Sequence, residues 1–408
     1  MRLTLSARQA VTNELKKKYN QATKAQKSEI IDWLVKVAGY NRKYAATILR
    51  NGASKKTTRS RPTPKPGRPP QYDEEVFFAL ERIWYIAGCI CGKRLAPFLG
   101  ELVPILTRFS ELDLTPEVEE KLVSISPATI DRLLAPVKKS LNFKGSSSTK
   151  PGTLLKSEIP IKTFSEWDDT KPGHVEVDLV AHNGGDPSGE FAYTLDVTDV
   201  ATGWTETKAV KNKAQVWVFY ALEKITDRLP FKVVGIDSDN GTEFINHHLL
   251  NYCKEHKINF TRSRPYRKND NCYVEQKNWS VVRKTVGYRR HDTDAERIIL
   301  NKIYKLLRPY TNYFQPSMKL VGKERDGAKV KKTYDKAKTP YRRLLTYETI
   351  SRSSKDKLKE EYLSLNPAKL NREIESLRRK LYQVNRRKGN EVTEKKEEIE
   401  NDLEYIVL

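Results

Sequence analysis

The 408-residue sequence has few cysteines and no long apolar run. None of its apolar stretches reaches the roughly 18 residues that a membrane-spanning helix needs, and the N-terminus lacks the apolar segment of a secretory signal. Four cysteines without a CxxC pair cannot form a disulfide framework in a chain of this length. We therefore expect a reduced, cytosolic protein with no membrane partner.

Positive charge is what the sequence has in excess. It contains 75 Lys and Arg against 52 Asp and Glu, a formal net charge of +23. Residues 1–72 alone hold 17 basic and 3 acidic residues, a surplus of 14. Such a surplus indicates a polyanionic partner, and nucleic acid is the leading candidate. The length exceeds one ordinary domain, so two to four domains are expected.

Residues 1–52 are predicted to form a helical DNA-binding domain. Ser6 can cap one helix and Thr23 a second, and Gly39 then separates the second helix from a third. This order is typical of a helix-turn-helix, whose last helix enters the major groove. A small basic helical bundle with solvated charges is the alternative. The candidate DNA contacts on the last helix are Arg42, Lys43 and Arg50.

A proline-rich, basic segment follows at residues 53–72. Its five prolines and six basic residues exclude a helix and favour an extended linker. The run Pro66-Gly67-Arg68-Pro69 is similar to the core of an AT-hook, but Pro66 replaces the first arginine. Arg68 is thus a candidate DNA contact, and a linker that tracks phosphates is favoured over a true hook.

Helical periodicity returns in residues 73–144. Thr115-Pro116 and Ser126-Pro127 each combine a capping residue with a proline suited to the first helical position. The segment is predicted to be a second helix-turn-helix or, equally, a helical spacer domain. Residues 145–164, rich in Gly and Ser at their start, are predicted to be a second linker.

Residues 165–312 change to alternating strand and helix patterns. Three strand candidates are followed by a helix, a fourth strand, a helix, a short strand and a helix, which predicts an α/β domain with one mixed sheet. The predicted strands cover residues 174–180, 191–197, 205–210, 231–239 and 258–261.

Three carboxylates have a notable placement in this domain. Asp178 and Asp239 belong to two predicted strands, and Glu275 lies near the start of the last helix, with 35 residues between Asp239 and Glu275. Three converging carboxylates can hold two divalent cations, which activate an attacking oxygen and stabilise a leaving one in phosphodiester chemistry. Oxygen ligands beside a phosphate suit Mg²⁺. Spacing alone does not distinguish them from scattered surface acids.

The runs around these residues give a resemblance to a known family. Val-Glu-Val-Asp at Asp178, Ile236 to Phe244, and Tyr273 to Trp279 resemble the Asp, Asp, 35-residue, Glu pattern of retroviral integrases and DDE transposases. The run Val-Glu-Gln-Lys-Asn-Trp is similar to one branch of bacterial insertion-sequence transposases. The resemblance implies an RNase H-like core, with Asp178, Asp239 and Glu275 binding Mg²⁺ or Mn²⁺, two ions in all.

Other acidic residues compete for these roles. Asp237 is the main rival of Asp239, which is favoured because Gly241 can take a positive φ where the chain turns. Glu176 and Asp196 are expected to be structural.

The sequence departs from retroviral integrases after Glu275. Where the family has lysines four and seven residues later, this chain has Trp279 and Val282. Trp279 is predicted to be a core residue, or else to stack on a displaced base. The integrase zinc module is missing, because the first histidine is His174, so no zinc is expected. The shifted positive charge makes three residues candidate DNA contacts: Lys277, Arg283 and Lys284.

Residues 313–408 are predicted to form a basic and helical extension. Lys323 to Arg343 hold nine basic and three acidic residues, which favours a loop-rich DNA-contacting segment or a solvated linker. Asn366-Pro367 starts a helix whose apolar stripe could dimerise or pack within the chain. The stripe is Leu370, Ile374, Leu377 and Leu381.

The function expected from this resemblance is DNA transposition. The enzyme would cut the 3′ ends of an insertion sequence in a metal-dependent step and join them to target DNA, after binding double-stranded terminal inverted repeats. Two ends must be brought together, so at least a homodimer is expected, in the bacterial cytoplasm at the nucleoid. The alternatives are an RNase H-like nuclease without joining activity and a catalytically inactive DNA-binding regulator.

Overall fold

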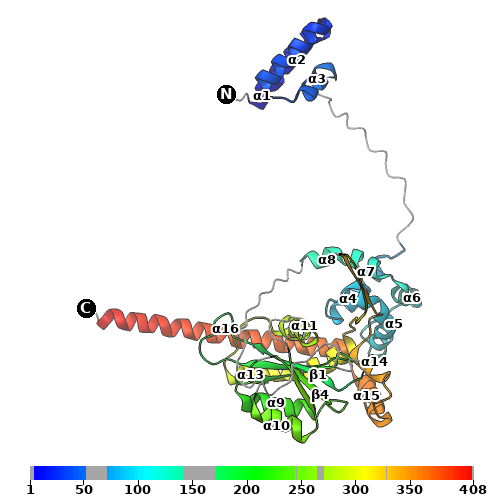
Figure 1. The fold of residues 1–408 in the computed structure, drawn as a ribbon, viewed down its shortest axis with the longest axis vertical. Coiled ribbons are helices and arrows are strands. Elements are labelled where there is room, and N and C mark those ends of the chain that lie inside the picture. Colours follow the sequence, from blue (N-terminus) through cyan, green and yellow to red (C-terminus); the bar gives the residue numbers. More distant parts are fainter. Residues whose placement is uncertain are drawn as a thin grey trace. The chain divides into compact units, whose positions relative to one another are not determined.

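The protein is represented by a computed structural model that describes residues 4–51, 71–140, 171–239, 241, 243–244, 246–263, 271–327 and 329–406. Arg68, almost all of the expected linker 53–72 and the whole of linker 145–164 lie outside these residues. The chain divides into two compact units, Met1–Gln71 and Tyr72–Leu408 (Figure 1). No helix in the described part of the chain is both long and apolar enough to cross a membrane.

The N-terminal unit contains three helices: α1 Leu5–Gln21, α2 Lys24–Ala38 and α3 Arg42–Asn51. The prediction that Ser6 caps α1 is wrong, because the Thr4 hydroxyl accepts the capping hydrogen bond from Ala7 N. Thr23 caps α2 as predicted, and Gly39 ends that helix at φ 68°. Leu34 on α2 and Leu49 on α3 are fully buried, so apolar packing holds the three helices together.

The second unit begins with a group of five helices: α4 Glu74–Ile86, α5 Gly92–Arg108, α6 Pro116–Ser124, α7 Pro127–Leu133 and α8 Ala135–Ser140. The predicted caps are confirmed, since the hydroxyls of Thr115 and Ser126 accept hydrogen bonds from the first turns of α6 and α7. Each helix has a proline at its first position, where no intrahelical donor is lost. Local capping chemistry therefore fixes these two helix starts.

A five-stranded mixed sheet with strand order β3-β2-β1-β4-β5 lies at the centre of the second unit. The first three strands are antiparallel, and β4 and β5 run parallel to β1. The predicted α/β class with one mixed sheet is confirmed. The strands are β1 His174–Ala181, β2 Tyr193–Asp199, β3 Thr205–Val210, β4 Gly235–Ser238 and β5 Asn259–Arg262.

Helices cover both faces of this sheet. On one face, α9 Gln215–Thr226 and α10 His247–Glu255 bury a cluster of apolar side chains from the strands, including Val177, Leu195 and Ile236. On the other face, α11 Cys272–Lys277 packs against β1 and β2, and α13 Asp294–Phe314 packs against β3. This second face carries the polar residues described below.

The segment after α13 corrects one prediction. Residues 323–343 are not loop-rich, because β6 Leu320–Asp326 and β7 Lys329–Tyr334 form an antiparallel hairpin, followed by α14 Pro340–Leu345. Gly327 favours this fold, since it begins the hairpin turn after the paired Asp326 and takes a φ of 55°, which suits glycine. The basic side chains project from the hairpin, whose second strand is exposed throughout.

The chain ends with α15 Arg352–Ser364 and α16 Pro367–Ile406, which runs beside α13 (Figure 1). Asn366 caps α16 as predicted, accepting hydrogen bonds from Ala368 N and Lys369 N. Its stripe packs within the chain: Leu370, Ile374 and Leu381 are buried in a core that also contains residues of α4, α5 and α13. Residues 73–140 therefore share one hydrophobic core with the rest of the second unit.

A carboxylate clamp connects α16 to the helical group. Glu111 accepts two hydrogen bonds from the Arg372 guanidinium, at 2.8 and 2.7 Å, and a third from Asn366 Nδ2 at 2.7 Å. Arg372 and Asn366 lower the pKa of Glu111 to about 2, because they stabilise its charged form. The clamp thus holds the start of α16 in place.

We predict that Glu111→Gln lowers the free energy of unfolding by about 1–2 kcal/mol at neutral pH, because a charged bidentate pair is lost. The folded pKa of Glu111 is depressed, so its contribution is complete above about pH 4.5 and is lost as pH falls toward 2. Urea unfolding at several pH values measures the effect. The matched control is Glu117→Gln on exposed α6, expected to change stability by less than about 0.5 kcal/mol; equal effects would contradict the clamp.

Candidate catalytic site

Acidic residues are concentrated on one face of the sheet. Strand register places Asp178 opposite Asp196 on β2 and Glu176 opposite Asp237 on β4. Side chains of directly paired residues project to the same face, and residues two apart on a strand share a face. Asp239, two positions after Asp237, therefore joins this group at the carboxyl end of β4. The face covered by α11 thus carries five carboxylates.

The negative charges of Asp239 and Glu275 both act on Asp178. Its Oδ1 accepts a hydrogen bond from Leu179 N at 2.8 Å, and its Oδ2 accepts one from Asn278 Nδ2 at 2.6 Å. Burial, together with the nearby charges of Asp239 and Glu275, raises the pKa of Asp178 to about 7, although these two hydrogen bonds act to lower it. The structure therefore brings the three sequence-predicted carboxylates near enough for their charges to interact.

Asp239 is held at the end of β4 by the turn that follows. Gly241 N donates to Asp239 Oδ1 at 2.9 Å, and burial raises the pKa of Asp239. The prediction that Gly241 takes a positive φ is wrong. A Cβ at Gly241 would lie 2.9 Å from Asp239 Oδ1 and 2.7 Å from the Glu243 carboxyl carbon, so a larger residue there would shift these two side chains.

Asp237, the rival of Asp239, has a structural environment. It is fully buried, and its Oδ1 accepts a hydrogen bond from the Thr261 hydroxyl at 2.5 Å, which links β4 to β5. Its position inside the strand, away from the strand end, leaves Asp239 as the carboxylate beside Asp178. This arrangement supports the choice of Asp239.

Glu176 fixes the helix that carries Glu275. Its Oε2 accepts hydrogen bonds from Tyr273 N at 2.9 Å and Val274 N at 3.0 Å, the first amides of α11. A carboxylate at a helix N-terminus satisfies unpaired amides and interacts favourably with the helix dipole. The structural role expected of Glu176 is confirmed, and it ties the position of Glu275 to β1.

Lys277 lies near enough to Asp196, the residue opposite Asp178 on β2, for their charges to interact. Burial raises the pKa of Asp196 well above its ordinary value, and Lys277 opposes this shift. Burial lowers the pKa of Lys277 to about 8, while Asp196 acts to raise it. Lys277 is half-buried on α11, so its charge compensates Asp196 within the site. Its contact with DNA stays a prediction.

The helix that carries Glu275 continues as a π-helix. α11 leads into η1 Asn278–Arg283 and then α12 Lys284–Val286. Helical segments with π geometry are frequently found at functional sites. Trp279 is 57% exposed on η1, so the prediction that it belongs to the core is wrong. The wider π turn therefore presents an aromatic ring to solvent one turn from Glu275.

Two residues of the site were missed by sequence reasoning. Asn278 binds Asp178, and Glu243 lies against Asp239, whose charge acts to raise the pKa of Glu243. Asn278 lies three residues after Glu275, a spacing that places both on one helical face, and this was the available signal. Glu243 had no comparable pattern, because its proximity depends on the turn at Gly241.

The predicted DNA contacts lie in different environments. Arg42 forms an ion pair with Asp32 and donates to Ser28 Oγ at 2.8 Å, whereas Lys43 and Arg50 are exposed on α3. Arg283 donates to Ala181 O at 2.7 Å. Lys284 is exposed and donates to a backbone carbonyl of the α4–α5 loop. These residues remain candidate contacts.

The carboxylate oxygens of Asp178 and Asp239 are donors of the kind that a divalent cation prefers. Among the residues that the structure describes, no three His, Cys, Asp or Glu side chains are arranged as a group that could hold a metal ion. The carboxylates of Asp178 and Asp239 approach each other at the sheet edge, and hard cations prefer such oxygen ligands. The raised pKa of Asp178 reflects burial and the negative charges of Asp239 and Glu275, and a bound cation would compensate these charges. The chemistry of these residues therefore fits Mg²⁺ or Mn²⁺.

Comparison with known proteins agrees with this architecture. Residues 168–268 match the sequence profile of the Integrase core domain. The chain is 37% identical over 342 residues to "Uncharacterized protein y4rM" of Sinorhizobium fredii (strain NBRC 101917 / NGR234), covering 82% of this chain and 93% of that protein. The chain belongs to the integrase core domain family. Its mixed sheet with flanking helices is accordingly an RNase H-like integrase core.

Two solved structures are also similar to the core. The catalytic core domain of BIV integrase matches with a TM-score of 0.29 and 17% identity, covering 43% of this chain and 94% of that one. The HTLV-2 integrase catalytic core domain, solved in complex with magnesium, matches with a TM-score of 0.27 and 13% identity, covering 36% and 90%. The integrase core itself indicates a polynucleotidyl-transferase-like function.

We predict that Asp178→Asn raises the melting temperature by several degrees above pH 7 in the absence of metal. The folded pKa of Asp178, about 7, exceeds its unfolded value, so wild-type stability falls as pH rises from about 4 to 7 and the cost is complete above pH 7. The substitution removes this cost. Thermal unfolding across this pH range measures it, with exposed Asp113→Asn as the control.

With added Mg²⁺, the wild type should have a higher melting temperature than Asp178→Asn. A cation that binds the folded state stabilises wild type, whereas Asp178→Asn lacks one ligand and should gain much less. Equal Mg²⁺-dependent shifts in wild type and variant would contradict a metal site at Asp178.

Proposed function

We propose that this protein is a DNA transposase that cleaves the 3′ ends of an insertion sequence and joins them to target DNA. The observation that carries the proposal is the meeting of Asp178 and Asp239 at the sheet edge with Glu275 near them, on a helix fixed by Glu176. This arrangement, within an integrase core, supports phosphodiester chemistry where the carboxyl end of β4 lies beside the middle of β1.

Asp178, Asp239 and Glu275 would hold two divalent ions. When bound, these ions would activate an attacking oxygen and stabilise a leaving oxygen. The remaining residues position the ligands: Asn278 orients Asp178, and the Gly241 amide orients Asp239. Lys277 limits the repulsion that Asp196 would otherwise add behind Asp178. The protein thus contributes geometry and charge balance.

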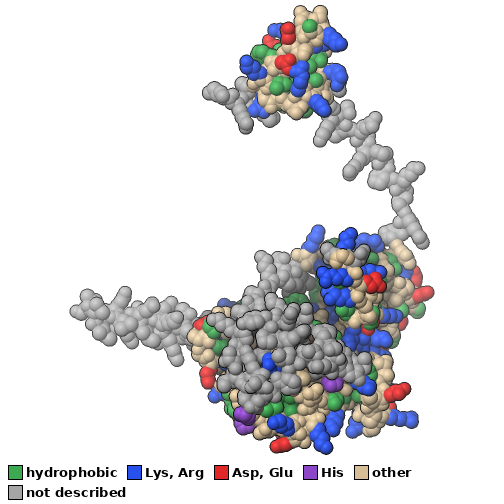
Figure 2. All heavy atoms as spheres, in the orientation of Figure 1, with side chains coloured by type: hydrophobic (Ala, Val, Ile, Leu, Met, Phe, Trp, Pro, Cys, Tyr) green, Lys and Arg blue, Asp and Glu red, His purple; other side chains and the backbone are tan. Residues whose placement is uncertain are grey.

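The N-terminal unit would bind the terminal inverted repeats. Figure 2 shows Lys and Arg side chains spread over the visible face of this unit with few acidic ones. Exposed Lys43 and Arg50 on α3 occupy the helix that would enter the major groove. Base contacts from this helix would give specificity, and the basic residues of 1–72 would add salt-dependent affinity for phosphates.

Transposition further requires that two DNA ends meet. We therefore infer a homo-oligomer, at least a dimer on DNA, that works in the bacterial cytoplasm at the nucleoid. The apolar stripe of α16 is buried within the chain up to Leu381, so this stripe does not supply the dimer contact.

We predict that Asp239→Asn abolishes Mg²⁺-dependent cleavage and joining while end binding remains, because a metal ligand is removed but the DNA surfaces are unchanged. Labelled DNA carrying the ends that flank the gene provides the substrate, and strand transfer is measured on gels. Cleavage without joining by the wild type would support the nuclease, and binding alone would support the regulator.

The matched variant is Asp237→Asn, which weakens the contact with Thr261. It should lower stability and retain cleavage at permissive temperature. Retained cleavage in Asp239→Asn together with its loss in a folded Asp237→Asn protein would assign the ligand role to Asp237.

We also predict that removal of residues 1–71 abolishes specific end binding, while residues 72–408, a compact unit with their own core, stay folded. DNase footprinting of the repeats and circular dichroism of the truncated protein check the two parts. A retained footprint would assign repeat recognition to the helical group α4–α8.

A further inference from the structure

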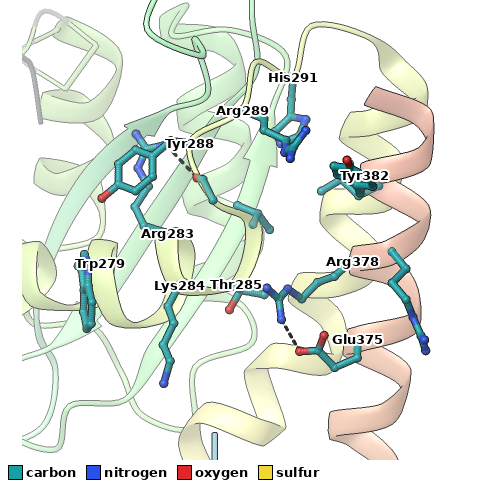
Figure 3. Close-up of a pocket in the computed structure, with 14 residues that line it drawn as sticks. Trp279, Arg283, Lys284, Thr285, Tyr288, Arg289, His291, Glu375, Arg378 and Tyr382 are labelled. Carbon is teal, nitrogen blue, oxygen red and sulfur yellow. Dashed lines mark hydrogen bonds and ion pairs between the residues drawn. The ribbon is translucent and has the colours of Figure 1, made fainter. Parts of the chain in front are cut away.

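A groove of about 500 Å³ lies between α16 and the helical segment that follows Glu275 (Figure 3). One wall is formed by η1, α12 and the residues that follow, and the other wall is formed by α16. Its volume lies within the range of about 300–1,000 Å³ typical of small-molecule sites, which is comparable to a nucleotide and much smaller than a duplex. The groove begins at Trp279, four residues after Glu275.

Three aromatic side chains in the groove are exposed: Trp279 at 57%, Tyr288 at 36% and Tyr382 at 45%. Arg283 stacks on the Tyr288 ring at 4.7 Å, and Arg289 stacks on the Tyr382 ring at 4.2 Å. Figure 3 shows Trp279 on η1 and Tyr382 across the groove on α16. Planar rings held in solvent beside guanidinium groups are the elements of a stacking platform for nucleobases.

The groove is also strongly basic. Five Lys and Arg side chains line it against one glutamate. That glutamate, Glu375, forms an ion pair with Arg378 (Figure 3). The remaining positive charge includes Arg379, also on α16, and Lys284 on α12. A concave site with charge of one sign attracts a ligand of the opposite sign, and here that ligand must also offer flat surfaces.

Both walls are anchored before any ligand binds. On α16, Leu381 is buried, Asn385 donates to Arg290 O at 2.6 Å, and Lys388 donates to Asp292 Oδ1 at 2.7 Å. On η1, Val282 is fully buried. The groove is therefore preformed, which limits the entropy lost on binding.

We propose that this groove binds one unpaired DNA strand at the transposon end, with a base stacked on Trp279 and phosphates on Arg289, Arg378 and Arg379. The inference rests on the proposed function and specifies the form of its substrate. A duplex keeps its bases stacked inside and offers no base face to Trp279, whereas an unpaired strand offers one. The groove thus holds the unpaired strand against a wall that begins four residues after Glu275.

The test uses the full-length protein and a short duplex with a single-stranded 3′ overhang that carries 2-aminopurine, in EDTA so that no strand is cut. Wild type should quench the probe through stacking. Trp279→Ala should lose most of the quench and bind the overhang on the order of tenfold more weakly. Trp279→Phe should keep a large part of both, and Trp217→Ala, at an exposed tryptophan on α9, should match wild type.

The charge contribution is tested on the same helix. Arg378→Ala with Arg379→Ala should weaken overhang binding several-fold more than Arg386→Ala with Arg387→Ala, an equal charge change at exposed positions outside the groove. Equal losses, or an unchanged quench in Trp279→Ala, would overturn the groove proposal even where wild type cuts and joins DNA in Mg²⁺. A Trp279-dependent quench in a wild-type protein without nicking would uphold the groove and contradict the transposase.

Discussion

Negative charge crowded on one face of a small sheet is the constraint on which this structure depends. Each buried carboxylate needs a polar or charged partner, and the chain provides a different one for each structural position. Backbone amides of α11 bind Glu176, the Thr261 hydroxyl binds Asp237, and Lys277 compensates Asp196. Asp178 keeps a raised pKa at the sheet edge, because its hydrogen bonds do not offset burial and the neighbouring carboxylates. The face thus separates structural acids from the proposed ligands.

The same contacts connect the sheet to the proposed substrate groove. Glu176 fixes the first amides of α11, so the helix that carries Glu275 starts at a position set by β1. The change to π geometry at Asn278 then exposes Trp279 while Val281 and Val282 stay buried. Because one continuous helical segment carries the ligand and the exposed ring, a base bound at Trp279 lies within a short distance along the chain from Glu275.

Features encoded locally could be predicted from the sequence. Thr115 and Ser126 cap their helices because the capping residue and the following proline act within one turn. The strand position of Asp178 also followed from a local pattern, whereas Asp239 lies just after β4 rather than within it. Trp279 was misjudged, since its exposure depends on the backbone geometry of η1. The contact between Glu243 and Asp239 and the burial of the α16 stripe could not be predicted, because they depend on turns and packing that join distant segments.

The distribution of positive charge near Glu275 shows why position on the helix is not enough to identify DNA contacts. Lys277 is half-buried and interacts with Asp196, and Arg283 is held by the Ala181 carbonyl and by Tyr288. Lys277 and Arg283, two of the basic residues on this helical segment, therefore make contacts within the catalytic core. Arg378 and Arg379 come from α16, about a hundred residues later, and restore positive charge at the groove. The C-terminal helix, rather than the Glu275 helix alone, thus completes the proposed DNA-binding groove.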